Sequence, residues 1–214
     1  MPSAGGERIR PIRSFVALEV EEPARSALVA YLAELRVAEG VAWTRPENLH
    51  VTLKFLGGVA PDRLGELTEP LAAAARGCAI FPVLYAGVGA FPSLVRPATL
   101  WVGAEASPLG PLARAVDEAS TRIGAAREER PFHPHVTLGR VRGHGKSRRG
   151  RAPRLPEGLC AALDAARVRA FGIAPARALV LFRSDTEPGG ARYTPLARFT
   201  FGGWGRPLRV AVRR

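Results

Sequence analysis

The chain of 214 residues is 47% apolar and 23% charged, the balance of a globular protein, and is long enough to bury one core as a single domain over residues 1–214. Its formal net charge of +12 favours a polyanionic partner, in particular a nucleic acid. No apolar run is long enough to cross a membrane and no signal peptide opens the sequence, so we expect a cytoplasmic protein without a membrane partner.

The first half of the chain alternates predicted strands and helices. Apolar and β-branched runs predict strands over residues 12–20, 41–44, 49–56, 80–89 and 98–104. Helices are expected from Pro23 to about Val37 and from Pro61 to about Arg76, because proline favours the first turn of a helix. Gly40 ends the first of these helices.

The second half repeats this order. Its helices are expected over residues 108–125 and 156–166, and its strands over 135–141, 167–174, 178–184 and 193–200. The duplication predicts an α+β fold with two lobes related by a pseudo-two-fold axis. We expect antiparallel sheets that line a central cleft, with helices on the outside. The ends, 1–11 and 202–214, are expected to be peripheral or frayed, although the second could also form an edge strand.

The tetrapeptide HVTL occurs twice, at residues 50–53 and 135–138. On a strand, a histidine and a threonine two residues apart project from one face about 6–7 Å apart, whereas the valine between them points into the core. The side chains that project in this way are His50, Thr52, His135 and Thr137. Two such strands side by side would surround one small anion, so the repeat predicts metal-free acid–base chemistry at a phosphate.

The two motifs and their flanks resemble the two-histidine (2H) phosphoesterases, most closely the bacterial and archaeal RNA 2′,3′-cyclic phosphodiesterases once called 2′-5′ RNA ligases. Four segments carry the resemblance: ENLHVTLKFLG at 47–57, FPSLVRPATLWVG at 91–103, PFHPHVTLGRV at 131–141 and LVLFRSDTEPGGARYTPL at 179–196. The resemblance implies a bilobal fold, no metal or other cofactor, and hydrolysis of a terminal 2′,3′-cyclic phosphate to a 2′-phosphomonoester. With an RNA 5′-hydroxyl in place of water, the same site would join RNA ends through a 2′-5′ linkage.

The resemblance also implies a role for each motif residue. The first histidine, His50, is the general acid or proton donor, and the second, His135, is the general base or proton acceptor. Thr52 and Thr137 hydrogen-bond the phosphate oxygens, and Arg140 contacts the phosphate. The two motifs are identical in sequence, so the assignment of acid and base rests on the resemblance alone.

Further candidate substrate contacts are Lys54, Phe132 and Tyr193. The chain departs from the family at two places. Gly139 stands where alanine is usual, and the basic loop 142–154 is unusually long. That loop is either a solvated run of charge or an arm that follows an RNA backbone.

A metal site is a weaker interpretation of the histidines. His133 could join His135 and His50 as a ligand, but a proline follows His133 and no carboxylate lies at ligand spacing. Cys78 and Cys160 have no ligand or redox spacing, so we expect two reduced thiols without a function.

Two other functions stay open from the sequence. A non-catalytic protein that binds RNA ends would use aromatic side chains as stacking platforms. The candidates for that role are Phe91, Trp101, Phe132 and Tyr193. An enzyme with the same site could instead hydrolyse 2′-5′-linked oligonucleotides or small cyclic nucleotides. No obvious association surface is present, so a monomer is expected.

Overall fold

The computed structural model describes residues 10–36, 38–143, 155–188 and 190–202. Its α-helices are α1 (Ala24–Leu35), α2 (Thr68–Arg76), α3 (Leu109–Ser120) and α4 (Glu157–Ala165), and its 3-10 helices are η1 (Pro46–Asn48), η2 (Pro61–Leu67) and η3 (Thr121–Ile123). Its strands are β1 (Ile12–Glu19), β2 (Val41–Trp43), β3 (His50–Val59), β4 (Phe81–Phe91), β5 (Thr99–Glu105), β6 (His135–Val141), β7 (Ala170–Ala176), β8 (Ala178–Glu187) and β9 (Gly190–Thr200).

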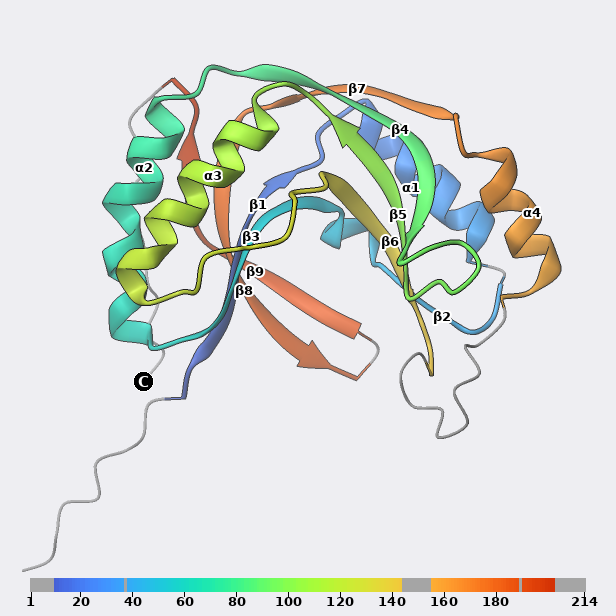
Figure 1. Cartoon of the computed structure of the whole chain (residues 1–214), viewed down its shortest axis with the longest axis horizontal. Helices are drawn as coiled ribbons and strands as arrows, with labels where there is room; N and C mark the ends of the chain where they lie inside the picture. The colour runs from blue at the N-terminus through green and yellow to red at the C-terminus, as the bar shows by residue number, and fades with distance from the viewer. Residues whose placement is uncertain (1–9, 37, 144–154, 189, 203–214) are drawn as a thin grey trace, which may run out of the picture.

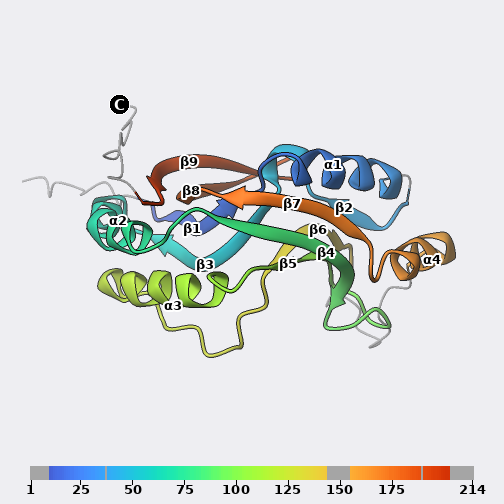
Figure 2. The same cartoon turned by 90° about the horizontal axis from the view of Figure 1, so that it is seen from above.

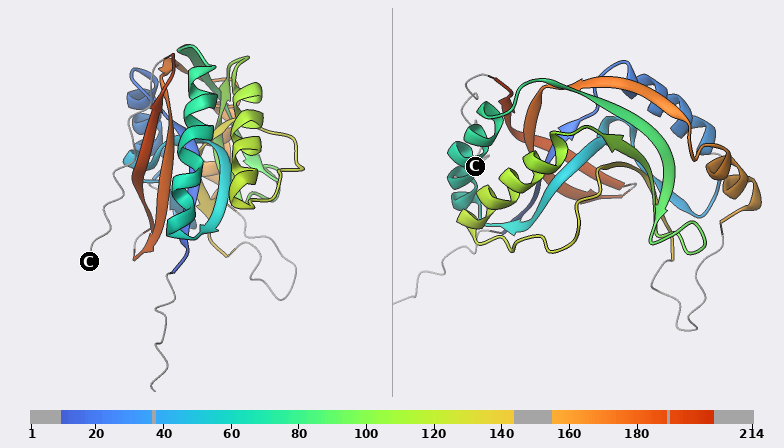
Figure 3. Two further views of the ribbon diagram at one scale, coloured as in Figure 1. Left: turned by 90° about the vertical axis from the view of Figure 1, so that its left-hand side faces the viewer. Right: turned by 45° about the horizontal axis from the view of Figure 1, so that its top comes forward.

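The strands form one curled antiparallel sheet in the order β7-β4-β5-β6-β3-β1-β8-β9, with β2 paired to β6 (Figure 1). Helices cover the outside of the curl. Figure 2 shows α2 and α3 at one end of the molecule and α1 and α4 at the other, and Figure 3 shows α2 and α3 side by side. The predicted α+β class, with antiparallel strands inside and helices outside, is confirmed.

The strand order is symmetrical about the junction of β3 with β6. Four strands lie on each side of it, β9-β8-β1-β3 on one and β6-β5-β4-β7 on the other. Each set contains strands from both halves of the sequence. In the set with β6, β4 and β5 come from the first half, and in the set with β3, β8 and β9 come from the second. The expected lobes are therefore joined through a continuous sheet at the two motif strands.

Two apolar clusters lie on opposite faces of this sheet. The main core fills the side toward the helices, whereas a small second cluster consists of Phe15, Ala17, Val180 and Phe182. We call the face that bears this second cluster the inner face. Strand β1 is buried on both faces from Ser14 to Leu18, which fits its central place between β3 and β8.

Differences from the predicted elements have local causes. The helix expected from Pro61 to Arg76 is a 3-10 helix followed by α2, because Pro70 is compatible only with the first turn of an α-helix. Strands β8 and β9 extend as a long hairpin to Glu187 and Gly190, beyond the predicted strand ends at residues 184 and 193. Residues 1–9, 144–154 and 203–214, which include most of the basic loop, lie outside the described residues. Within the described part of the chain, no helix is long and apolar enough to cross a membrane.

Close packing of β2 on β6 explains Gly139, which pairs with Trp43. A Cβ atom at this position would lie 2.6 Å from Cγ1 of Val41 and 2.9 Å from Cε3 of Trp43. We predict that Gly139→Ala lowers the free energy of unfolding by about 1–3 kcal/mol through overpacking. The control is Gly65→Ala, because a Cβ atom there meets nothing within 4 Å. Urea unfolding measures both variants, and equal stability of the two would contradict this account of Gly139.

Candidate active site

The two motif strands meet at one antiparallel residue pair, Val51 of β3 and Val136 of β6. Both valines are fully buried in the main core. Successive side chains on a strand point to opposite faces, so the residues on either side of each valine face away from that core. In each motif, the side chains of the histidine and the threonine therefore point to the inner face.

This register brings the four predicted catalytic side chains together. Antiparallel pairing of the two valines directs His50 toward the Thr137 side and Thr52 toward the His135 side, and the charge of His135 acts on His50. Side chains directly opposite each other on paired strands have Cβ atoms about 4.5–5.5 Å apart. Two imidazoles and two hydroxyls thus share one small patch of the inner face, as the motif predicted.

Hydrogen bonds fix the tautomer of His50. Its Nδ1 lies 2.6 Å from the carbonyl oxygen of Asn48, so Nδ1 carries a proton and donates it. Nε2 is then the acceptor in the neutral ring and lies 2.9 Å from the Thr52 hydroxyl, which donates to it. The Asn48 amide in turn donates to the carbonyl oxygen of Ala191 at 2.7 Å, which ties this turn to β9.

His135 has the same local arrangement. Its Nδ1 lies 2.7 Å from the carbonyl oxygen of His133, two residues earlier in the chain. In both motifs the backbone therefore holds the Nδ1 proton and leaves Nε2 as the nitrogen that can gain or lose one. The two histidines are equivalent in tautomer as well as in sequence.

Aromatic rings enclose each imidazole. Around His50, the ring centroid of Phe15 lies at 4.9 Å and that of Tyr193 at 5.3 Å, the latter edge-on. Around His135, the ring of Phe91 lies at 5.1 Å, also edge-on. The rings replace water on the sides of both histidines without adding a charge.

This enclosure keeps both histidines neutral. Burial lowers the pKa of His50 to about 4, and the positive charges of His135 and Arg140 act in the same direction, while the Asn48 carbonyl opposes them. Burial also lowers the pKa of His135 below its ordinary value, again with Arg140 contributing. At neutral pH the free site therefore holds two uncharged imidazoles beside one guanidinium.

Arg140 supplies the positive charge of the site. Its side chain is exposed, its Nη1 lies 3.4 Å from the Thr99 hydroxyl, and its charge acts on both histidines and on Tyr193. Tyr193, whose pKa is raised mainly by burial, contacts His50 directly. Arg140 and Tyr193 thus lie beside the histidines, and their contact with substrate stays a prediction.

Two predicted substrate contacts lie elsewhere. Lys54 is buried, and its ammonium lies 2.5 Å from the carboxylate of Asp117 on α3 and 2.5 Å from the carbonyl oxygen of Ala126. The cause is a β-bulge at Leu53, which reverses the alternation of side chains after Thr52. Phe132 packs against the main core and not against the histidine rings. Neither residue belongs to the group that meets at the motifs.

Sequence reasoning missed Phe15, Phe182 and Asn48. Phe15 stacks on Phe182 at 5.1 Å and contacts His50, so β1 and β8 form one wall of the site. The signal was the unbroken apolar run of β1, which required burial of both faces of that strand. Asn48 acts through its backbone carbonyl, and no residue type identifies such a role.

His50, His133 and His135 do not form a metal-binding group with carboxylates or thiols of the described residues. Among the residues that the structure describes, no three His, Cys, Asp or Glu side chains are arranged to hold a metal ion. His133 instead packs against Trp101, with ring centroids 4.8 Å apart. The side chain of His133 therefore belongs to the aromatic surroundings of His135.

Comparison with known proteins agrees with this geometry. The sequence matches the family described as LigT like phosphoesterase twice, over residues 18–101 and 102–193, with one HVTL motif in each match. The chain belongs to the LigT-like phosphoesterase family. The resemblance drawn from the motifs is thereby confirmed. The boundary between the two matches falls within β5, a few residues before the second half of the predicted repeat begins.

Individual relatives of the family cover most of this chain. A protein of Archaeoglobus fulgidus named RNA 2′,3′-cyclic phosphodiesterase is 37% identical over 132 residues, 61% of this chain and 73% of the relative. One of the same name from Methanothermobacter thermautotrophicus is 30% identical over 190 residues, 88% of this chain and 98% of the relative. A crystal structure of a Thermus thermophilus protein has a TM-score of 0.72 at 29% identity, covering 90% of this chain and 99% of that one.

Burial of a neutral His50 makes stability depend on pH. The unfolded chain takes up this proton near the ordinary pKa of about 6.5, whereas the folded protein takes it up near 4, so the unfolded state binds more protons in between. The contribution of His50 to stability is complete above its pKa in the unfolded chain. It is lost as the pH falls toward its pKa in the folded protein. We predict that His50 accounts for a loss of about 2 kcal/mol between pH 8 and pH 5.

Urea unfolding at the two pH values measures this loss. His50→Asn removes the titrating group and is expected to lose correspondingly less stability than the wild type. His133→Asn, which leaves His50 in place, serves as the matched control and retains the full loss. Equal losses in the wild type and His50→Asn would show that His50 is not held neutral by burial.

Proposed function

We propose that the protein is a metal-independent RNA 2′,3′-cyclic phosphodiesterase, which opens a terminal 2′,3′-cyclic phosphate to a 2′-phosphomonoester. The observation that carries the proposal is the pairing of Val51 with Val136, because it sets two imidazoles and two hydroxyls on one patch of surface. The names of its relatives support the substrate, and the net charge of +12 suits RNA.

The reaction needs one proton acceptor and one proton donor on opposite sides of phosphorus. His135, neutral, takes a proton from water through Nε2 as the water oxygen bonds to phosphorus. His50, protonated at Nε2, gives its proton to the departing 3′-oxygen as the bond from phosphorus to that oxygen breaks. The phosphate stays on the 2′-oxygen, and the two histidines end with their protonation states exchanged.

The remaining polar groups stabilise the negative charge of the transition state. The hydroxyls of Thr52 and Thr137 donate to the non-bridging oxygens, and Arg140 supplies a full positive charge. A preorganised donor at a developing oxyanion contributes about 3–4 kcal/mol in comparable sites. When substrate binds, the Thr52 hydroxyl exchanges its bond to His50 for one to a phosphate oxygen.

The bound phosphate also makes His50 able to act as an acid. Burial and nearby positive charges lower its pKa in the free site. An anionic phosphodiester a few ångströms away favours the protonated ring and offsets the effect of Arg140. Substrate binding therefore favours protonated His50, the form that can donate a proton.

Assays distinguish the other reactions and functions that the same site could have. An RNA 5′-hydroxyl that attacks phosphorus in place of water would displace the same 3′-oxygen and form a 2′-5′ linkage. A cyclic-phosphate-ended oligonucleotide, a 2′,3′-cyclic mononucleotide and a 2′-5′ oligoadenylate, compared side by side, identify the substrate class. Binding of all three without turnover would favour a protein that only holds RNA ends.

We predict that His50→Ala and His135→Ala each lower kcat by about 10²- to 10⁴-fold, the usual contribution of a positioned acid or base. Thr52→Val and Thr137→Val are expected to cost about 10²-fold each, while Thr121→Val, at the end of α3, is the matched control. Turnover of 2′,3′-cyclic AMP measures all five. Near-normal turnover in either histidine variant would contradict its role, and loss of turnover in EDTA would contradict the metal-free mechanism.

We also predict that kcat/KM follows a bell-shaped pH profile with its maximum between pH 4 and pH 6.5. The reactive form carries one proton shared by two histidines, and kcat/KM reports the free enzyme, in which both pKa values lie below 6.5. The value of kcat/KM therefore falls as the pH rises above 6.5. A maximum above pH 7.5 would contradict the burial of the two rings.

A further inference from the structure

We propose that Phe55 and Arg13 form a second nucleotide site, which holds the penultimate nucleotide of an RNA whose cyclic phosphate lies at the histidines. The site rests on the proposed function, because it receives the chain that continues from the 5′ side of the terminal nucleotide. Phe55 provides a surface for the base, and Arg13 provides charge for the phosphate.

Phe55 is an exposed aromatic ring on the inner face. It lies on β3 directly opposite Phe15 of β1, and its side chain is 64% exposed. Of the large apolar side chains that are exposed in the described residues, the others are Ile80, Val95, Val168 and Ile173, none of them aromatic. An exposed ring is the feature on which an unpaired base can stack.

The ring also lies at the right distance from the histidines. Phe15 contacts His50 with ring centroids 4.9 Å apart and Phe55 with centroids 6.0 Å apart. One aromatic side chain thus separates Phe55 from the proton donor. A base stacked on Phe55 would belong to a neighbouring nucleotide and not to the one being hydrolysed.

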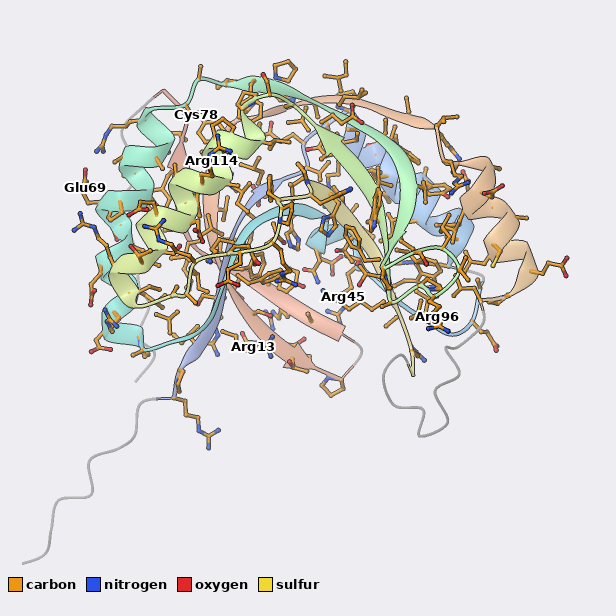
Figure 4. All side chains as sticks on the ribbon, in the orientation of Figure 1. Arg13, Arg45, Glu69, Cys78, Arg96 and Arg114 are labelled. Atoms are coloured by element: carbon orange, nitrogen blue, oxygen red, sulfur yellow. The ribbon has the colours of Figure 1, made fainter. Side chains whose placement is uncertain are left out.

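Arg13 lies on the same face of the sheet, two residues before Phe15 on β1. Its positive charge acts on the hydroxyl of Tyr193, which contacts His50, so Arg13 also borders the catalytic patch. Figure 4 shows Arg13 near the β8–β9 hairpin and far from Arg114 on α3. Phe15, the next residue after Arg13 on this face, contacts both His50 and Tyr193, so Arg13 lies beside the catalytic patch.

A basic hollow continues outward from Arg13. It has a volume of about 500 Å³, and its polar lining consists of three arginines, one carboxylate and two hydroxyls: Arg10, Arg13, Arg183, Asp185, Ser184 and Thr186. Ser184 pairs with Tyr193 in the β8–β9 register, which connects the hollow to the catalytic patch. Within the described part of the chain, neither Arg10 nor Arg13 has an acidic partner, in contrast to Arg183, which pairs with Asp185.

These features together suit a nucleotide. Guanidinium groups without acidic partners, with hydroxyls beside them, bind a phosphate, and the adjacent exposed ring binds a base without sequence preference. An acidic peptide would need the charges but not the ring, and an apolar partner would avoid the charges. The combination favours single-stranded RNA that leads away from the histidines.

The test compares two substrates, 2′,3′-cyclic AMP and the dinucleotide ApA ending in a 2′,3′-cyclic phosphate. We expect the wild type to prefer the dinucleotide in kcat/KM. Phe55→Ala is expected to lower the ratio of dinucleotide to mononucleotide kcat/KM about tenfold, as loss of one base stack implies, and Phe55→Trp is expected to retain it. The matched control is Ile173→Ala, which removes an exposed apolar side chain of β7 and leaves the ratio unchanged.

Arg13 is tested through the salt dependence of the dinucleotide reaction. Arg13→Gln is expected to reduce the slope of log kcat/KM against log salt concentration by about one, as loss of one phosphate contact implies. A dinucleotide with an abasic upstream position keeps this contact but lacks the base. It should therefore respond to Arg13→Gln and not to Phe55→Ala.

The outcomes separate the second site from the proposed function. If the wild type hydrolyses both substrates but Phe55→Ala leaves the ratio unchanged, the second site is wrong and the phosphodiesterase stands. If the wild type has no preference for the dinucleotide, the second site is likewise overturned. If it hydrolyses neither substrate, the proposed function fails and the second site fails with it.

Discussion

The pairing of β3 with β6 at Val51 and Val136 is the contact on which the site depends. The two strands come from different halves of the chain, and each has its own partner on the far side, β1 for β3 and β5 for β6. Burial of both valines fixes the face to which the polar residues turn, because a slip of one residue would send the histidines into the core. A hydrophobic constraint thereby determines the geometry of a polar site.

The same packing sets the protonation of the site. Aromatic rings of β1, β4 and β9 surround the histidines, and the backbone carbonyls of Asn48 and His133 hold their Nδ1 protons. Exclusion of water makes a charged imidazole unfavourable until a compensating anion arrives. In the proposed mechanism, the phosphate of the substrate is the anion that favours protonation of His50.

The sequence was sufficient for those features that follow from periodicity. The spacing of His50 and Thr52 predicted a shared face, and the duplication of elements predicted the symmetry about β3 and β6. It was insufficient where a local irregularity changes the period, as at the Leu53 bulge that directs Lys54 to Asp117. It was also insufficient where a backbone group positions a side chain. The Asn48 carbonyl that holds His50 is a group that every residue type carries.

In a shared site one small anion contacts both imidazoles at once, and histidine NMR tests this most directly. Inorganic phosphate is titrated into the protein while the ring signals of His50 and His135 are followed over pH, with His133→Asn used for assignment. The account predicts that phosphate shifts both signals together and raises the pKa of both rings. A shift of one ring alone, or separate affinities for the two rings, would contradict a shared site.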